Sequence, residues 1–136
     1  MPKAWKLWKS SSELVERPVV DFSGKWVNDL KSYMEISVKG DRVTGTYHTR
    51  VGAPTIEEEF PLIGYVNGNL IAFIVDFGEH GSIGSFAGYF VKDSSKGKSE
   101  RIYSLWHLVS NKEGAAKSKR PWDVFSTSFN IFKRNR

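Results

Sequence analysis

The chain has 136 residues, of which 40% are hydrophobic and 14% aromatic, and it contains no cysteine. This length suits one domain with a substantial core, and the lack of cysteine excludes disulfide bonds and thiolate metal sites. The formal net charge is +5, but residues 21–111 hold 9 basic and 11 acidic residues, so the excess lies at the two ends. A nucleic-acid groove needs positive charge on its binding face, and no nucleic-acid partner is therefore expected.

Residues 1–20 are interpreted as an N-terminal arm that precedes a single domain over residues 21–136. The arm mixes tryptophans with lysines, and Pro18 would end any short helix formed before it. It lacks the continuous apolar segment of a secretory signal, and no apolar run in the chain is long enough to span a bilayer. We therefore expect a soluble protein without a membrane partner. The compartment stays open, because a chain without cysteine tolerates either redox state.

The rest of the chain alternates hydrophobic and polar residues over short segments, as strands do. Turn residues such as Lys39-Gly40-Asp41 and Asn67-Gly68-Asn69 separate these segments and indicate antiparallel hairpins. Strands are expected at residues 23–29, 33–39, 42–51, 59–66, 70–78, 83–92, 101–110 and 122–133. No helices are expected to cover a sheet, so closure would remove its edges. The predicted fold class is all-β, an eight-stranded antiparallel up-and-down β-barrel with room for one small ligand.

The alternation also assigns the two faces of each strand. Asn28 shares the inward face with Trp26, and a buried amide without a partner costs roughly 1 to 3 kcal/mol. Something inside the barrel is therefore expected to bond it. The outward faces of the last two strands are largely apolar and carry Tyr103, Leu105, His107, Val109, Phe125, Thr127, Phe129 and Ile131. A contiguous apolar exterior of this kind predicts an oligomer that covers it.

Several separated motifs occur in one order along residues 22–134. They are Gly24-Lys25-Trp26-Val27-Asn28-Asp29-Leu30, Val43-Thr44-Gly45-Thr46-Tyr47, Ser104-Leu105-Trp106-His107-Leu108, Trp122 and Asn130-Ile131-Phe132-Lys133-Arg134. In this order they resemble the avidin and streptavidin family of biotin-binding β-barrel proteins. The resemblance implies non-catalytic, high-affinity binding of biotin without any cofactor. It also implies a homo-oligomer, either a dimer or a tetramer, and secretion is common in the family.

The resemblance implies a role for each of five polar residues around the ureido group of biotin. Asn28, Ser32 and Tyr47 would donate hydrogen bonds to the ureido oxygen. Thr49 and the side-chain oxygen of Asn130 would accept hydrogen bonds from the ureido N–H groups. Donors and acceptors would then match the two edges of a urea, and a water-excluded pocket would strengthen each hydrogen bond.

The resemblance further implies an apolar cage around the bicyclic ring and donors for the carboxylate tail. The cage would consist of Phe77, Phe86 and Trp106, with Leu30, Val51 and Leu108 alongside. Ser82 and the backbone N–H of Ala53 match positions near the carboxylate, and His80 near the mouth is a candidate replacement for a donor that Pro54 cannot supply. Trp122 resembles a tryptophan that the family lends to the pocket of a neighbouring subunit.

Two positions depart from the family pattern, because Phe77 stands where tryptophan is common and Gly84 stands where a threonine faces the thioether sulfur. Trp26 is expected to seal the closed end of the barrel and to lie outside the site. A lipocalin-like carrier of a different small ligand is the alternative, although such carriers favour apolar interiors. His48, His80 and His107 fit no metal or general-base motif, so no metal and no enzymatic activity are expected.

Overall fold

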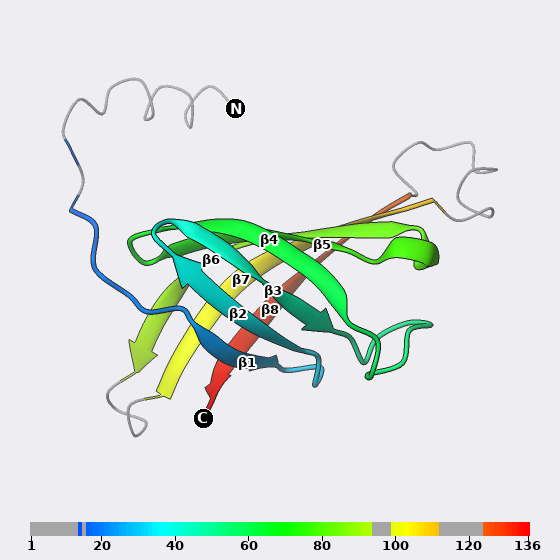
Figure 1. Ribbon diagram of the computed structural model, residues 1–136, viewed down its shortest axis with the longest axis horizontal. Helices are drawn as coiled ribbons and strands as arrows, with labels where there is room; N and C mark the ends of the chain where they lie inside the picture. The colour runs from blue at the N-terminus through cyan, green and yellow to red at the C-terminus, as the bar shows by residue number, and fades with distance from the viewer. Residues whose placement is uncertain (1–13, 15, 94–98, 112–123) are drawn as a thin grey trace.

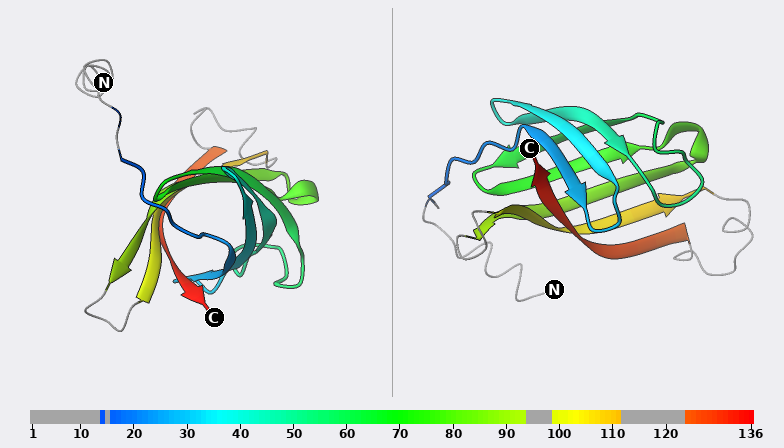
Figure 2. Two further views of the ribbon diagram at one scale, coloured as in Figure 1. Left: turned by 60° about the vertical axis from the view of Figure 1, so that its left-hand side comes forward. Right: turned by 90° about the horizontal axis from the view of Figure 1, so that it is seen from below.

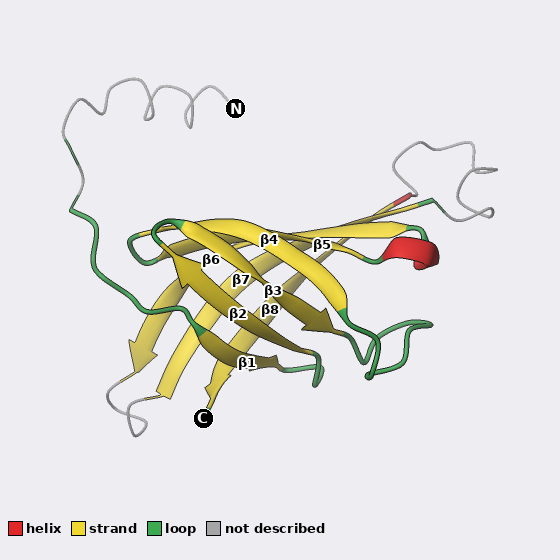
Figure 3. Ribbon diagram, in the orientation of Figure 1, coloured by secondary structure: helices red, strands yellow, loops and turns green. Residues whose placement is uncertain are grey.

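A computed structural model of the protein describes residues 14, 16–93, 99–111 and 124–136. Eight antiparallel strands follow one another in sequence order and close into a barrel, because β8 pairs with β1 (Figure 1). The strands are β1 (Gly24–Asn28), β2 (Tyr33–Lys39), β3 (Arg42–His48), β4 (Phe60–Asn67), β5 (Leu70–Asp76), β6 (Ser82–Asp93), β7 (Ser99–Ser110) and β8 (Phe125–Asn135). A 3₁₀ helix, η1 (Gly78–His80), joins β5 to β6 (Figure 3). The all-β, up-and-down barrel predicted from the sequence is confirmed.

Some strand boundaries differ from the expected ones where side chains bond the backbone. β3 ends at His48 instead of residue 51, because the hydroxyl of Thr49 accepts the N–H of Val51 at 3.0 Å and donates to its carbonyl at 3.1 Å. This local pair turns the chain away from the sheet. β5 ends at Asp76, since the chain enters η1 after Phe77. The expected start of the last strand, residue 122, lies outside the described residues.

The connections between strands alternate between the two ends of the barrel. The β1–β2 turn, the β3–β4 loop and η1 lie at one end, which we call the mouth (Figure 1). The β2–β3 and β4–β5 turns lie at the other end, which we call the closed end. There the N-terminal segment passes the β4–β5 turn, where Gly68 has a φ of 59° and lies against Arg17 and Pro18. A side chain at Gly68 would meet both residues, so glycine serves the turn and the contact.

Aromatic side chains fill the closed end of the barrel. Phe22 and Trp26 are fully buried, and each meets the ring of Phe90 edge to face, with centroids 6.0 and 6.4 Å apart. The indole N–H of Trp26 donates to the carbonyl oxygen of Phe22 at 2.8 Å. Trp26 therefore lies where a residue that seals the closed end of the barrel is expected.

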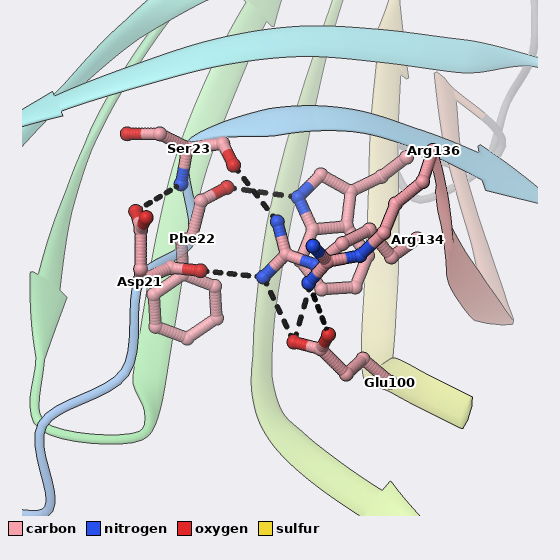
Figure 4. Close-up of polar contacts among 7 residues, drawn as sticks. Asp21, Phe22, Ser23, Glu100, Arg134 and Arg136 are labelled. Atoms are coloured by element: carbon pink, nitrogen blue, oxygen red, sulfur yellow. Dashed lines mark hydrogen bonds and ion pairs between the residues drawn. The ribbon is translucent and has the colours of Figure 1, made fainter. Parts of the chain in front are cut away.

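Arg134 ties the two ends of the chain together across this aromatic plug (Figure 4). Its guanidinium lies 4.3 Å from the ring centroid of Trp26 and donates to the carbonyl oxygens of Asp21 and Ser23. It also pairs with Glu100 at 3.0 Å. Burial raises the pKa of Glu100, but hydrogen bonds from Arg136 and Arg134 outweigh that effect and hold its pKa below the usual value. The guanidinium therefore joins β1, β7 and β8 at one point.

Inward-facing side chains from β2 to β8 form the remaining core. Its fully or nearly fully buried members include Met34, Val43, Leu62, Ile71, Phe73, Val75, Phe86, Ile102 and Phe132. Gly64 faces Phe73 of the neighbouring strand, and a side chain there would lie 2.1 Å from the carbonyl oxygen of Ala72. The close approach of β4 and β5 thus requires glycine. Within the described ranges, no helix is both long enough and apolar enough to cross a membrane.

Figure 2 shows the barrel from two further directions, and its left view places the final strand beside β1. This closure matters for the site, because it brings the end of β1 next to the middle of β8. Asn28 on β1 pairs in register with Phe132, two residues beyond Asn130. Residues 14 and 16–19 are exposed and have no regular secondary structure, and the rest of the expected arm lies outside the described residues.

Candidate ligand-binding site

Five polar side chains are buried together inside the barrel on its mouth side. They are Asn28, Ser32, Tyr47, Thr49 and Asn130, with exposed fractions of 5%, 1%, 4%, 6% and 5%. They come from β1, the β1–β2 turn, the end of β3 and β8, so segments that are far apart in the chain meet here. A buried polar group is costly unless it is bonded, which makes five such groups in one place a candidate site.

The β1–β2 turn fixes the orientation of the Asn28 amide. Its side-chain oxygen accepts the backbone N–H groups of Leu30 and Ser32, both at 3.0 Å, and this pattern identifies the oxygen. The turn itself is closed by backbone hydrogen bonds and places Lys31 at a φ of 68°, a left-handed conformation that is unusual for lysine. The NH₂ group of Asn28 must therefore point into the barrel.

The hydrogen atoms of that NH₂ group have only long hydrogen-bond contacts. The nitrogen lies 3.5 Å from the hydroxyl of Tyr47 and 3.4 Å from the side-chain oxygen of Asn130. Both distances exceed the 2.9 to 3.0 Å that is usual for N–H donors. A ligand oxygen placed between these groups could accept a shorter hydrogen bond. The NH₂ group of Asn28 is therefore a candidate donor to a ligand.

Ser32 and Thr49 divide the roles of donor and acceptor. The Ser32 oxygen accepts the N–H of Arg50 at 2.9 Å, and its hydroxyl points to the Thr49 oxygen at a long 3.5 Å. The Thr49 hydroxyl donates to the carbonyl of Val51, so its oxygen can offer only lone pairs to the barrel interior. Ser32 can therefore donate to a ligand and Thr49 can accept from one.

Tyr47 connects the polar cluster to an aromatic group. Burial raises the pKa of its hydroxyl to about 12, although hydrogen bonds with Ser32 and Asn28 partly oppose the increase. The hydroxyl is therefore neutral near pH 7 and can donate. The Tyr47 ring meets Phe77 edge to face at 6.1 Å and lies 5.6 Å from Phe86. The polar centre thus borders directly on aromatic walls.

Phe77, Phe86 and Trp106 form these walls around Gly84. Phe77 and Phe86 are 7% and 2% exposed, and Trp106 is half-buried with its ring 6.4 Å from Phe86. A Cβ atom at Gly84 would lie 3.3 Å from both Phe77 and Trp106. The rings of Phe77 and Trp106 therefore lie close to the space that a larger side chain at position 84 would need. Phe77 and Gly84, the two positions that depart from the family pattern, are therefore packed against each other.

The structure does not enclose every expected site residue. Leu30 and Val51 are 54% and 51% exposed and Ala53 is exposed, because they lie on the turn and loop at the mouth. They are not brought into the aromatic cage. Leu108 is half-buried against the core, and Ser82 is half-buried at the start of β6, where its carbonyl accepts the N–H of Phe77. Trp122 lies outside the described residues.

Sequence reasoning missed two histidine contacts near the mouth. His48 faces outward, as its alternation predicts, yet only 6% of it is exposed, because the β3–β4 loop covers it. His80 contacts the carboxylate of Glu58 in the same loop. Alternation within a strand cannot report a loop that folds back over the outer face, so no sequence signal predicted either contact. In the described part of the chain, no three potential metal-binding side chains gather.

The fold is a small closed β-barrel with a buried polar cluster beside aromatic side chains, an arrangement typical of barrels that hold a ligand in the interior. A sequence profile of the Avidin family matches residues 17–135, and the chain belongs to that family. A comparison with curated protein sequences finds no match.

Solved structures with the same fold include the following three. Xenavidin is 26% identical with a TM-score of 0.70, covering 85% of this chain and 97% of its own. The rhizavidin–biotin complex is 23% identical with a TM-score of 0.71, covering 86% of this chain and 98% of its own. A biotin binding protein from chicken is 24% identical with a TM-score of 0.71, covering 85% and 97%. These likenesses support the fold across the whole barrel.

Proposed function

We propose that the protein binds biotin inside the barrel and releases it chemically unchanged. The observation that carries this proposal is the division of donors and acceptors among the five buried polar residues. A urea presents one acceptor oxygen and two N–H donors. Asn28, Ser32 and Tyr47 have hydrogens available for the oxygen, while Thr49 and Asn130 have oxygens available for the N–H groups. A purely apolar ligand would offer no hydrogen-bond partner to these available hydrogens and oxygens.

The aromatic walls supply the second part of the binding free energy. Phe77, Phe86 and Trp106 lie beside the polar cluster, so the sulfur-containing ring and the alkyl chain would lose contact with water there. Each Å² of apolar surface removed from water contributes roughly 25 cal/mol, and the hydrogen bonds gain strength in the dry interior. We expect the tail to leave through the mouth, near Ser82 and the backbone N–H of Ala53.

We further propose that the functional unit is a homo-oligomer in which Trp122 covers the pocket of a neighbouring subunit. An apolar outer surface supports this assembly. Leu105, Val109, Phe125 and Phe129 on β7 and β8 are 52%, 39%, 59% and 54% exposed. Exposed apolar residues continue on β4 and β5, with Ile63 and Ile74. Monomeric proteins rarely expose a continuous apolar surface of this extent, so a second copy of the chain is the expected cover.

Titration calorimetry with biotin tests the ligand directly. We expect measurable heat, a stoichiometry of one biotin per chain and a raised melting temperature. A sulfur-ring analogue with the same tail but no ureido group should bind far more weakly. Binding of the analogue or of a fatty acid with equal affinity would instead favour a lipocalin-like carrier, and no heat with biotin would refute the proposal. Mass spectrometry of the recovered biotin should find it unmodified, and sedimentation should find an oligomer.

A further inference from the structure

The β3–β4 loop is tied to the barrel mouth at two points, and a histidine makes each contact. Beneath the loop, the ring of His48 stacks on Tyr33 with centroids 4.3 Å apart, and its Nδ1 lies 2.9 Å from the carbonyl oxygen of Ile56. Further along the loop, both carboxylate oxygens of Glu58 lie 3.2 Å from Nε2 of His80 in η1. The second contact joins two different connections of the barrel.

The loop itself orients the Glu58 carboxylate for this contact. One oxygen accepts the N–H of Thr55 at 2.9 Å, while the N–H of Glu58 donates to the Thr55 carbonyl at 3.1 Å. This reciprocal pair forms a tight turn and limits the directions that the carboxylate can take. The side chains of His80 and Glu58 are 30% and 42% exposed, so water screens the contact only in part.

Ring contacts lead from this pair to the ligand site. His80 meets Phe60 edge to face at 5.8 Å, and Phe60 lies 5.0 Å from Phe77. Phe77 in turn meets Tyr47 at 6.1 Å. Movement of His80 would therefore loosen a wall of the cage as well as the loop. His80 is thus connected to Tyr47 of the polar cluster through packed side chains.

We propose that His80 and Glu58 form a pH-sensitive latch that holds the β3–β4 loop at the mouth and slows the departure of bound ligand. The proposal rests on the proposed function and adds regulation to it. Histidine side chains ordinarily gain a proton between pH 5 and 8. The other charged residues lining the same hollow are acidic: Glu59 on the loop side, Asp76 at the end of β5 and Glu79 in η1. A proton on His80 adds an ion pair to the existing hydrogen bond, so release slows as the pH falls.

Release of labelled biotin into excess unlabelled biotin, measured between pH 5.5 and 8, tests the latch. We expect release from the wild type to be about 2- to 5-fold faster at pH 8, as suits a partly exposed ion pair. His80→Gln should abolish this dependence because glutamine gains no proton in this range, and Glu58→Gln should abolish it because a neutral amide forms no ion pair with a protonated His80. Glu79→Gln is the matched control, because it removes a carboxylate from the same hollow without untying the loop, and it should keep the dependence. A His80→Gln variant with the full wild-type dependence would overturn the latch and implicate His48.

Biotin methyl ester separates the latch from direct recognition of the ligand carboxylate. The ester lacks the negative charge of the tail, and the latch predicts the same pH dependence of its release. If the dependence vanishes with the ester while it persists with biotin, His80 acts on the tail and the latch is refuted.

Hydrogen exchange of residues 49–59 in the ligand-free protein makes the test independent of biotin. After correction for intrinsic exchange, the loop should be about 2- to 5-fold better protected at pH 5.5 than at pH 8 in the wild type, and equally protected in His80→Gln. A protein that gives no heat with biotin but shows this protection would support the latch and refute the proposed function. Tight biotin binding without any pH effect on loop protection or on release would support the proposed function and refute the latch.

Discussion

Replacing Tyr47 with phenylalanine removes one hydroxyl from the polar cluster and keeps the ring. The ring is 4% exposed and packs on Phe77 and Phe86, and phenylalanine preserves these contacts. The hydroxyl lies 3.5 Å from the Asn28 nitrogen, too far for a strong bond. We therefore expect the unfolding free energy at pH 7 to change by less than about 1 kcal/mol.

Biotin affinity should respond much more strongly than stability does. Loss of one buried hydrogen bond to the ureido oxygen costs roughly 1 to 3 kcal/mol, which weakens the affinity by about 5- to 150-fold. Calorimetry on Tyr47→Phe and on Tyr33→Phe checks this expectation. Tyr33 faces outward on β2 and stacks on His48, so phenylalanine there keeps the stack and serves as the control. Equal affinities of the two variants would remove Tyr47 from the site.

The same substitution tests the raised pKa of Tyr47 without any ligand. The unfolded chain loses the tyrosine proton near pH 10, whereas the folded protein retains it to about 12. The unfolded state therefore binds fewer protons in this window, and stability falls as the pH rises, by about 1.4 kcal/mol per pH unit from this one group. Urea unfolding between pH 9 and 11.5 should show a shallower decline in Tyr47→Phe. An identical decline would contradict the burial of a neutral hydroxyl.

Three further substitutions probe other parts of the molecule. Asn130→Ala should weaken biotin binding by roughly 1 to 3 kcal/mol in calorimetry, through loss of an acceptor for a ureido N–H, and unchanged affinity would refute that role. Arg134→Lys should lower the unfolding free energy by roughly 1 to 3 kcal/mol, because lysine cannot stack on Trp26 while donating to Asp21, Ser23 and Glu100. A urea unfolding curve that matches the wild type would show that these Arg134 contacts do not stabilise the fold. Trp122→Lys should weaken both biotin binding and assembly, and a variant with intact sedimentation and affinity would remove Trp122 from the pocket.

Alternation and turn residues were sufficient to predict the barrel, because strand faces and turns are both determined by residues that are close together in the sequence. The same alternation placed Asn28 inward, and the structure brings it to Asn130, 102 residues away. The resemblance to a family, rather than periodicity, suggested what the polar residues do. The resemblance also placed Leu30 and Val51 alongside the cage, and the structure has both exposed, because they lie on the turn and the loop at the mouth.

The contacts that could not be predicted lie between connections. His80 and Glu58 belong to different loops, and no spacing rule relates two loops that happen to meet at one end of a barrel. The burial of His48 likewise depends on the path of the β3–β4 loop, which its own sequence does not specify. The packing of Phe77 and Trp106 over Gly84 was also not predicted, since Phe77 and Gly84 were each considered separately as departures from the family pattern.

Stability and binding are concentrated at opposite ends of the barrel, and the short strand β1 connects them. Trp26 lies in the plug of the closed end, held by Arg134, while Asn28 on the same face lies in the polar cluster. The cluster contains long, weak hydrogen bonds and a left-handed Lys31, each of which costs folding free energy. The plug offsets such costs with buried rings and charge-assisted bonds to the backbone. A polar cluster with such long hydrogen bonds can persist because the other end of the same strand is so firmly held.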